Sequence, residues 1–223
     1  MKNPPVIVGI GEVLWDVYPD AAHFGGAPAN FAAHAAALAG RSHLVSAVGL
    51  DAYGERAAAI MRGRDISCEH LQLDPLRATG SVAVSLDAQR VASYRFAPDA
   101  AWDHIAWTPS LGELAARCDA VCFGTLGQRG PVSRATIRRF LRATRPAALR
   151  VFDVNLRQGF HDADTILASL ELASAVKLNE SELPLVAHHA GIDHLDDAST
   201  LRALAERFDL SLAVLTLGDQ GSL

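Results

Sequence analysis

Apolar runs of strand length alternate with helical stretches along most of the chain, and this order is the feature that most restricts its fold. The strand-length runs cover residues 5–11, 44–48, 120–124, 149–154, 175–178 and 212–217. The helical stretches cover residues 29–39, 53–62, 133–145, 164–172, 181–187 and 200–208. Because strands buried on both faces belong to parallel sheets covered by helices, the order predicts a doubly wound α/β core of three layers, α/β/α, with a mainly parallel sheet.

One region departs from this alternation. Residues 79–86 and 91–96 alternate between polar and apolar types around residues 87–90, which predicts a β-hairpin. Together with strands from residues 12–24, the hairpin would form a small sheet beside the main body. On pattern alone it is as consistent with an ordinary edge hairpin as with a lid over a cleft. We expect one domain over residues 1–223, with lid strands from about 12–24 and 77–97 inserted into it.

Composition narrows the function classes. The formal net charge is -5, and the 20 Lys and Arg residues are scattered, so nucleic acid is not an expected partner. No run of 18 apolar residues exists, and the apolar stretch near the N-terminus is too short for a signal peptide, so we expect no membrane partner and a cytoplasmic location. The three cysteines have no CxxC spacing and are interpreted as free thiols.

The segment Gly25-Gly26-Ala27-Pro28-Ala29-Asn30 has the features expected at the bottom of a binding site for a small ligand. Two glycines let the backbone approach a ligand closely, and Pro28 suits the first turn of a helix. Asn30 would then present an amide that both donates to and accepts from a hydroxyl. Asp16, just after the first strand, could accept hydrogen bonds from two neighbouring hydroxyls, although a solvated loop aspartate is the simpler interpretation of its position.

Three later strand ends also carry polar residues. Asp153, Asn155 and Arg157 would share one side if their strand persists, and an arginine there can bind phosphate oxygens in a fork. Asn179 and Glu182 are three residues apart on an opening helix turn, where an N-capping role for Asn179 explains them equally well. The last strand leads into a glycine-rich turn. Familiar nucleotide loops are absent: the GxGxxG pattern that begins at Gly9 fails, and no GxxxxGK[ST] sequence exists.

Taken in order, these segments resemble the ribokinase-type (PfkB) family of carbohydrate kinases, and the wording around the two glycines is similar to its fructokinase-like branch. The resemblance favours the interpretation of the hairpin as a lid over that of an ordinary edge hairpin. It implies ATP-dependent phosphorylation of a sugar hydroxyl, with ATP and Mg²⁺ as cofactors, a small sugar as partner and a possible homodimer through the lid.

The resemblance also assigns roles to individual residues. It implies that Arg157 faces the transferring phosphate and that Glu182 and Asn179 position magnesium through water. The residues it implies for sugar binding are Asp16, Gly25, Gly26, Asn30 and Arg95, although an exposed edge-strand arginine explains Arg95 equally well. Those it implies for nucleotide binding are Asn155, Lys177, Asn179, Thr216, Gly218 and Gly221.

The chain departs from the family pattern in one respect. The Gly-Ala-Gly-Asp turn that holds the family's catalytic aspartate does not occur in these 223 residues. We expect that aspartate to lie beyond Leu223, so that the C-terminal nucleotide and catalytic portion is missing and this chain is weakly active or inactive. The alternatives are a non-catalytic, truncated sugar-binding relic and a nucleoside kinase of the same superfamily.

Overall fold

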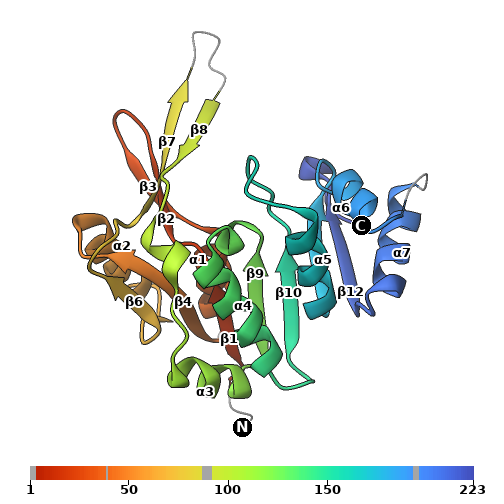
Figure 1. The fold of residues 1–223 in the computed structure, drawn as a ribbon, viewed down its shortest axis with the longest axis horizontal. Coiled ribbons are helices and arrows are strands. Elements are labelled where there is room, and N and C mark those ends of the chain that lie inside the picture. The colour runs from red at the N-terminus through yellow and green to blue at the C-terminus, as the bar shows by residue number, and fades with distance from the viewer. Residues whose placement is uncertain (1–3, 39, 87–91, 193–195) are drawn as a thin grey trace.

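The main sheet confirms the predicted α/β core. The computed structural model describes residues 4–38, 40–86, 92–192 and 196–223. Eight strands form this sheet in the order β12-β11-β10-β9-β1-β4-β5, with β6 also paired to β4, and every pairing is parallel. Their bounds are β1 (Val6–Ile10), β4 (Arg41–Gly49), β5 (Ile66–Ser67), β6 (Leu71–Asp74), β9 (Ala120–Gly124), β10 (Leu149–Asp153), β11 (Ala175–Asn179) and β12 (Leu212–Thr216) (Figure 1).

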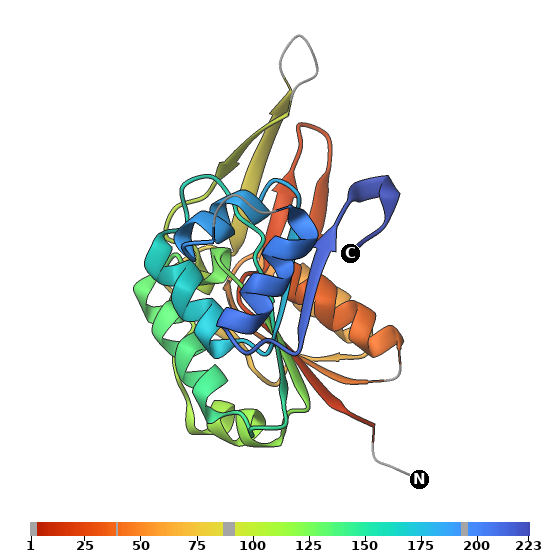
Figure 2. The same cartoon turned by 90° about the vertical axis from the view of Figure 1, so that its right-hand side faces the viewer.

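Helices cover both faces of this sheet (Figure 2). On one face, α1 (Ala27–Ala37) and α2 (Ala52–Arg62) pack on β4 through a cluster that includes Leu44 and Val48. A larger cluster, which includes Val45 and Ala47, packs the other face against five helices. Leu44 and Val45 thus lie on opposite faces, as strand geometry requires. The five helices are α3 (Pro109–Arg117), α4 (Pro131–Ala143), α5 (Ala163–Leu172), α6 (Leu183–His189) and α7 (Asp197–Arg207).

A second, four-stranded sheet projects from the main body, as predicted (Figure 1). Its order is β3-β2-β7-β8, in which β2 and β7 are parallel and the two outer pairings are antiparallel. The predicted turn at residues 87–90 lies outside the described residues. The strands are β2 (Leu14–Val17), β3 (Ala22–Gly25), β7 (Gly80–Leu86) and β8 (Ala92–Phe96). We call this sheet the lid sheet.

Local capping explains where several helices begin. Asp51, Thr108, Asp162 and Asp196 each accept a hydrogen bond from a backbone N–H in the first turn of α2, α3, α5 and α7, respectively. The sequence reading missed α3, although Thr108 followed by a proline is a typical helix start. In the described part of the chain, none of the helices has both the length and the apolar character needed to cross a membrane.

Asp51 also fixes the root of the lid sheet. Its Oδ1 accepts from the Gly54 backbone N–H at 2.8 Å and from the Thr79 hydroxyl at 2.7 Å, and its Oδ2 accepts from the Thr79 backbone N–H at 2.8 Å. The same hydroxyl accepts from the Gly49 backbone N–H at 2.9 Å. One carboxylate therefore joins the end of β4, the start of α2 and the segment that enters β7.

We predict that Asp51→Ala lowers the free energy of unfolding by about 2–3 kcal/mol, because it removes a helix cap and leaves the Thr79 N–H unpaired. Asp162→Ala removes a cap whose hydrogen bond is to its own helix, with only the charges of Arg134 and Arg138 nearby, and should cost only about 1 kcal/mol. Urea unfolding of the two variants measures the difference. Equal losses would show that the contacts to Thr79 contribute nothing.

Candidate functional site

A cavity of about 910 Å³ lies between the lid sheet and the carboxyl ends of the main strands. The strand order runs outward from β1 in both directions, and ligands of open α/β sheets bind outside the carboxyl ends of strands at such a switch point. The lid sheet, the first turns of α1 and the segment that follows β10 line most of it, together with Glu12 after β1 and Leu126 after β9. The cavity therefore occupies the position where a ligand is expected.

Four of the predicted sugar-binding residues line this cavity together: Asp16, Gly25, Gly26 and Asn30. Gly26 is the N-cap residue of α1 with φ 113°, and a Cβ there would lie 2.4 Å from the Glu12 carbonyl oxygen. Only glycine fits this position without strain. Burial raises the pKa of Asp16, while the nearby Arg157 and His23 partly offset that effect.

Glu12 is a lining residue that the sequence reading missed. Its side chain is almost fully enclosed, with 1% of the residue exposed. One carboxylate oxygen, Oε1, accepts from the Ala27 backbone N–H at 3.2 Å, and Oε2 has no hydrogen-bond partner among the described residues. Burial raises the pKa of Glu12 to about 7, and the nearby charge of Asp153 adds to the rise, against smaller opposing effects of backbone N–H groups and Arg157. Its position directly after the first strand was the available signal.

The segment after β10 brings Asp153, Asn155 and Arg157 to the same cavity. The strand does not persist, since β10 ends at Asp153 and Asn155 adopts a left-handed conformation with φ 43°. A turn, rather than strand alternation, therefore directs these residues. The Thr125 hydroxyl donates to the Val154 carbonyl at 2.8 Å and holds the turn in place.

Glu182 fixes the same turn from the other side. Its residue is 3% exposed, and its carboxylate accepts from the Leu156 N–H at 2.8 Å and from the Asn179 N–H at 2.9 Å. The Asn179 side-chain oxygen accepts from the backbone N–H groups of Ser181 and Glu182, each at 3.0 Å. The Asn179 side chain thus holds the turn between β11 and α6, whose own N-cap residue is Glu182, and Glu182 joins β11 to the segment after β10.

The remaining predicted nucleotide-binding residues lie along the same edge of the sheet but do not line the cavity. Lys177, in β11, forms a salt bridge of 3.0 Å with Asp153. Thr216 ends β12 opposite Asn179 in the parallel ladder, and Gly218 and Gly221 follow it with positive φ. Polar groups thus continue from the cavity across β10, β11 and β12.

Arg95 is the one predicted sugar-binding residue that the structure does not bring to the cavity. It is exposed in β8, and its neighbours Tyr94 and Phe96 line the cavity instead. Successive residues of a strand point to opposite faces, so Arg95 lies on the far face of the lid sheet. The Gln158 side chain donates to the Tyr94 carbonyl and connects the lid sheet to the segment after β10.

Comparison with known proteins identifies the family. The family model described as "pfkB family carbohydrate kinase" matches residues 20–223. The chain belongs to the pfkB family of carbohydrate kinases. It is 29% identical to a fructokinase of Salmonella typhimurium over 96% of this chain and 71% of that protein.

Solved structures of two similar kinases share the fold. Fructokinase from Vibrio cholerae O395 in its apo form superimposes with a TM-score of 0.83 at 25% identity, covering 98% of this chain and 77% of that one. The same enzyme has been solved in a form bound to fructose, ADP and calcium. A sugar kinase from Pyrococcus horikoshii in complex with ATP gives a TM-score of 0.78 at 26% identity, covering 97% of this chain and 72% of that one.

The buried carboxyl of Glu12 should make stability depend on pH. The unfolded chain releases this proton near pH 4.5, but the folded chain releases it only near pH 7. Its contribution to stability is therefore complete below pH 4.5 and is lost as the pH rises through 7. We predict that Glu12→Gln removes a decline on the order of 2–3 kcal/mol between pH 5 and pH 8. Urea unfolding at the two pH values measures it.

The matched control for this experiment is Glu113→Gln, an exposed position on α3. Its stability should follow that of the unsubstituted chain at both pH values. Parallel pH profiles for Glu12→Gln and the unsubstituted chain would contradict the buried-carboxyl interpretation.

Glu182→Gln should lower the free energy of unfolding by about 1–3 kcal/mol, because an amide provides one acceptor oxygen where two backbone N–H groups now bind. Glu180→Gln changes an exposed neighbour in the same way and should be close to neutral. Thermal or urea unfolding compares the two. A neutral Glu182→Gln variant would mean that the two N–H groups find other acceptors.

Proposed function

We propose that this chain forms the sugar-binding part of a kinase that transfers the γ-phosphate of ATP to a hydroxyl of a fructose-like sugar. The observation that supports this proposal is the single cavity that gathers Asp16 and Asn30, two partners for hydroxyls, with Arg157, a partner for phosphate. Family membership and the fructose-bound and ATP-bound relatives support the same reaction.

The proposed sugar contacts follow from the chemistry of the lining groups. The Asp16 carboxylate would accept hydrogen bonds from neighbouring hydroxyls, and the Asn30 amide would both donate and accept. The backbone at Gly25 and Gly26 leaves space beside the ring. Tyr94 and Phe96 would cover the bound sugar with apolar surface and exclude water from it.

Arg157 is the proposed partner of the transferring phosphate. Its planar guanidinium can bind two phosphate oxygens at once, which a lysine cannot do. Lys177, Asn155, Asn179, Thr216, Gly218 and Gly221 would receive the rest of the nucleotide along the edge formed by β10, β11 and β12. Phosphoryl transfer depends mainly on positioning and on stabilising negative charge, which suits this set of groups.

Magnesium fits this edge only through water. The oxygens of Glu182 and the side-chain oxygen of Asn179 already accept hydrogen bonds from N–H groups. Each Glu182 oxygen accepts one hydrogen bond and keeps a lone pair for a water molecule, whereas the Asn179 side-chain oxygen already accepts three hydrogen bonds. Mg²⁺ keeps several of its waters in phosphate sites, so the proposal places it on the ATP phosphates with these residues behind its water shell.

The sugar contacts can be tested by binding alone. Isothermal titration with fructose should detect binding to the 223-residue chain, and Asp16→Asn should weaken it by about 10–100-fold, because it replaces charge-assisted hydrogen bonds. Asp20→Asn, at the exposed tip of the same hairpin, should bind fructose normally. Equal affinities for Asp16→Asn and the unsubstituted chain would exclude Asp16 as a sugar contact.

Transfer of phosphate needs a separate assay, since the 223 residues contain no Gly-Ala-Gly-Asp turn. ADP release with Mg²⁺-ATP is measured over a panel of sugars led by fructose. Fructose-dependent release that falls in Arg157→Ala, and is not restored by Arg157→Lys, would support the kinase proposal and the forked contact. Fructose binding without ADP release would support the proposed sugar contacts but not the proposed transfer of phosphate. Failure to bind any sugar in the panel would overturn both.

A further inference from the structure

A second group of chemically active side chains lies at the other end of β4, away from the cavity. His43 is near the start of β4, and Glu69 and His70 lie in the turn between β5 and β6. Because β5 and β6 both pair with β4, this turn runs alongside the strand. The family resemblance does not involve any of the three residues.

The geometry brings the three side chains to one point. One nitrogen or oxygen from each residue lies within 4.8 Å of the others. The Nε2 atom of His70 is 3.9 Å from a carboxylate oxygen of Glu69, and the two imidazole ring centres are 6.0 Å apart. Neighbours in sequence normally point apart in a strand, so the convergence of Glu69 and His70 requires the turn.

Two of these groups are buried without partners. His43 is 9% exposed and His70 is 5% exposed. His43 Nδ1 and His70 Nε2 have no hydrogen-bond partner among the described residues. A buried nitrogen without a partner costs about 1–3 kcal/mol, and two of them in one cluster indicate a missing ligand.

We propose that His43, Glu69 and His70 bind one divalent transition-metal ion of the zinc type. Imidazole and carboxylate ligands suit Zn²⁺, and two histidines with one glutamate form a known zinc ligand set, with water in the fourth position. The side chain of Glu69 is 63% exposed, so it can move toward an ion without disturbing the core.

The charge around the cluster is compatible with a cation. Burial lowers the pKa of both histidines; the charge of Glu69 opposes this effect and that of Arg117 adds to it, and the net direction keeps both imidazoles neutral near pH 7 with a lone pair available. Glu69 supplies one negative charge. Arg41 and Arg117 face His43 from β4 and α3, but both are exposed, and solvent screens their repulsion.

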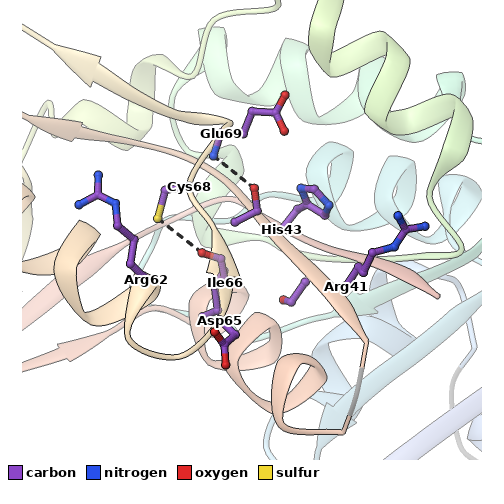
Figure 3. A pocket seen from close by; sticks show the side chains of 9 residues that line it. Arg41, His43, Arg62, Asp65, Ile66, Cys68 and Glu69 are labelled. Atoms are coloured by element: carbon purple, nitrogen blue, oxygen red, sulfur yellow. Dashed lines mark hydrogen bonds between the residues drawn. The ribbon is translucent and has the colours of Figure 1, made fainter. Parts of the chain in front are cut away.

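An open pocket reaches two of the three proposed ligands, His43 and Glu69; His70 is not among the residues that line it. A pocket of about 680 Å³ is lined by His43 and Glu69 among others (Figure 3). Cys68 also lines it, but its sulfur contacts the carbonyl oxygens of Ala58 and Ile66 and points away from the His43 ring. The ligand set is therefore two nitrogens and one carboxylate oxygen, without thiolate.

Cobalt(II) is the probe for this site, because its visible d–d absorption reports ligand type and geometry. The chelator-treated 223-residue chain should bind one equivalent of Co²⁺, which Zn²⁺ displaces, with no sulfur-to-cobalt charge-transfer band. Glu69→Gln should weaken binding by at least about 10-fold, and His43→Gln or His70→Gln should abolish the band. Glu69 is exposed, so its variant tests the site even if the histidine variants do not fold.

Two controls separate this site from adventitious binding. His188→Gln/His189→Gln removes an adjacent histidine pair on α6 and should leave the one-equivalent band intact, as should Cys68→Ser. Zinc at about 100 times its dissociation constant should raise the melting temperature by roughly 5–10 °C in the unsubstituted chain but not in His70→Gln. Absence of a Co²⁺ band, its survival in both Glu69→Gln and His70→Gln, or its loss in the α6 control would overturn the proposal.

Discussion

The hydrogen bond between the Glu12 carboxylate and the Ala27 N–H supports the floor of the cavity. Helix α1 begins at Ala27; its N-cap residue, Gly26, has no side chain to cap it, and its first turn contains no acidic residue. Glu12 reaches the helix from the end of β1 and places a carboxyl group at the positive end of the helix dipole. The close approach of Gly26 to the Glu12 carbonyl depends on the same arrangement. This contact ties the first turn of α1, which carries Asn30, to the segment after β1.

Two other carboxylates position further parts of the cavity wall, also by accepting hydrogen bonds from backbone N–H groups. Glu182 accepts two backbone N–H groups and sets the turn that carries Asn155 and Arg157. Asp51 accepts backbone N–H groups from α2 and from the entry to β7, and so sets the root of the lid sheet. In each case one acidic side chain joins segments that are distant in sequence. The cavity is therefore shaped by backbone groups that these carboxylates hold in position.

The core of the fold could be predicted from the sequence, but these carboxylate contacts could not. The six main predicted strands and the lid hairpin follow from apolar patterning, which is a local property of the chain. Helix α3 was missed because it is short: its buried apolar face is limited to Leu111, Leu114 and Ala115, after the cap formed by Thr108 with Pro109. Alternation identified β8 as a strand, but whether Arg95 or Tyr94 faces the cavity depends on how the lid sheet sits on the core. The partners of Glu12 and Glu182 are set by tertiary packing, which no local pattern encodes.

Strand β4 relates the cavity to the histidine cluster. All strands of the main sheet run in the same direction, so their carboxyl ends gather the ligand-binding loops and their amino ends face the opposite side. His43 is near the amino end of β4, while Gly49 at its carboxyl end donates to Thr79 at the root of the lid sheet. β4 is paired on both sides and buried along most of its length, so it resists deformation. An ion at His43 would therefore stabilise the sheet edge formed by β5 and β6 and leave the geometry of the cavity unchanged.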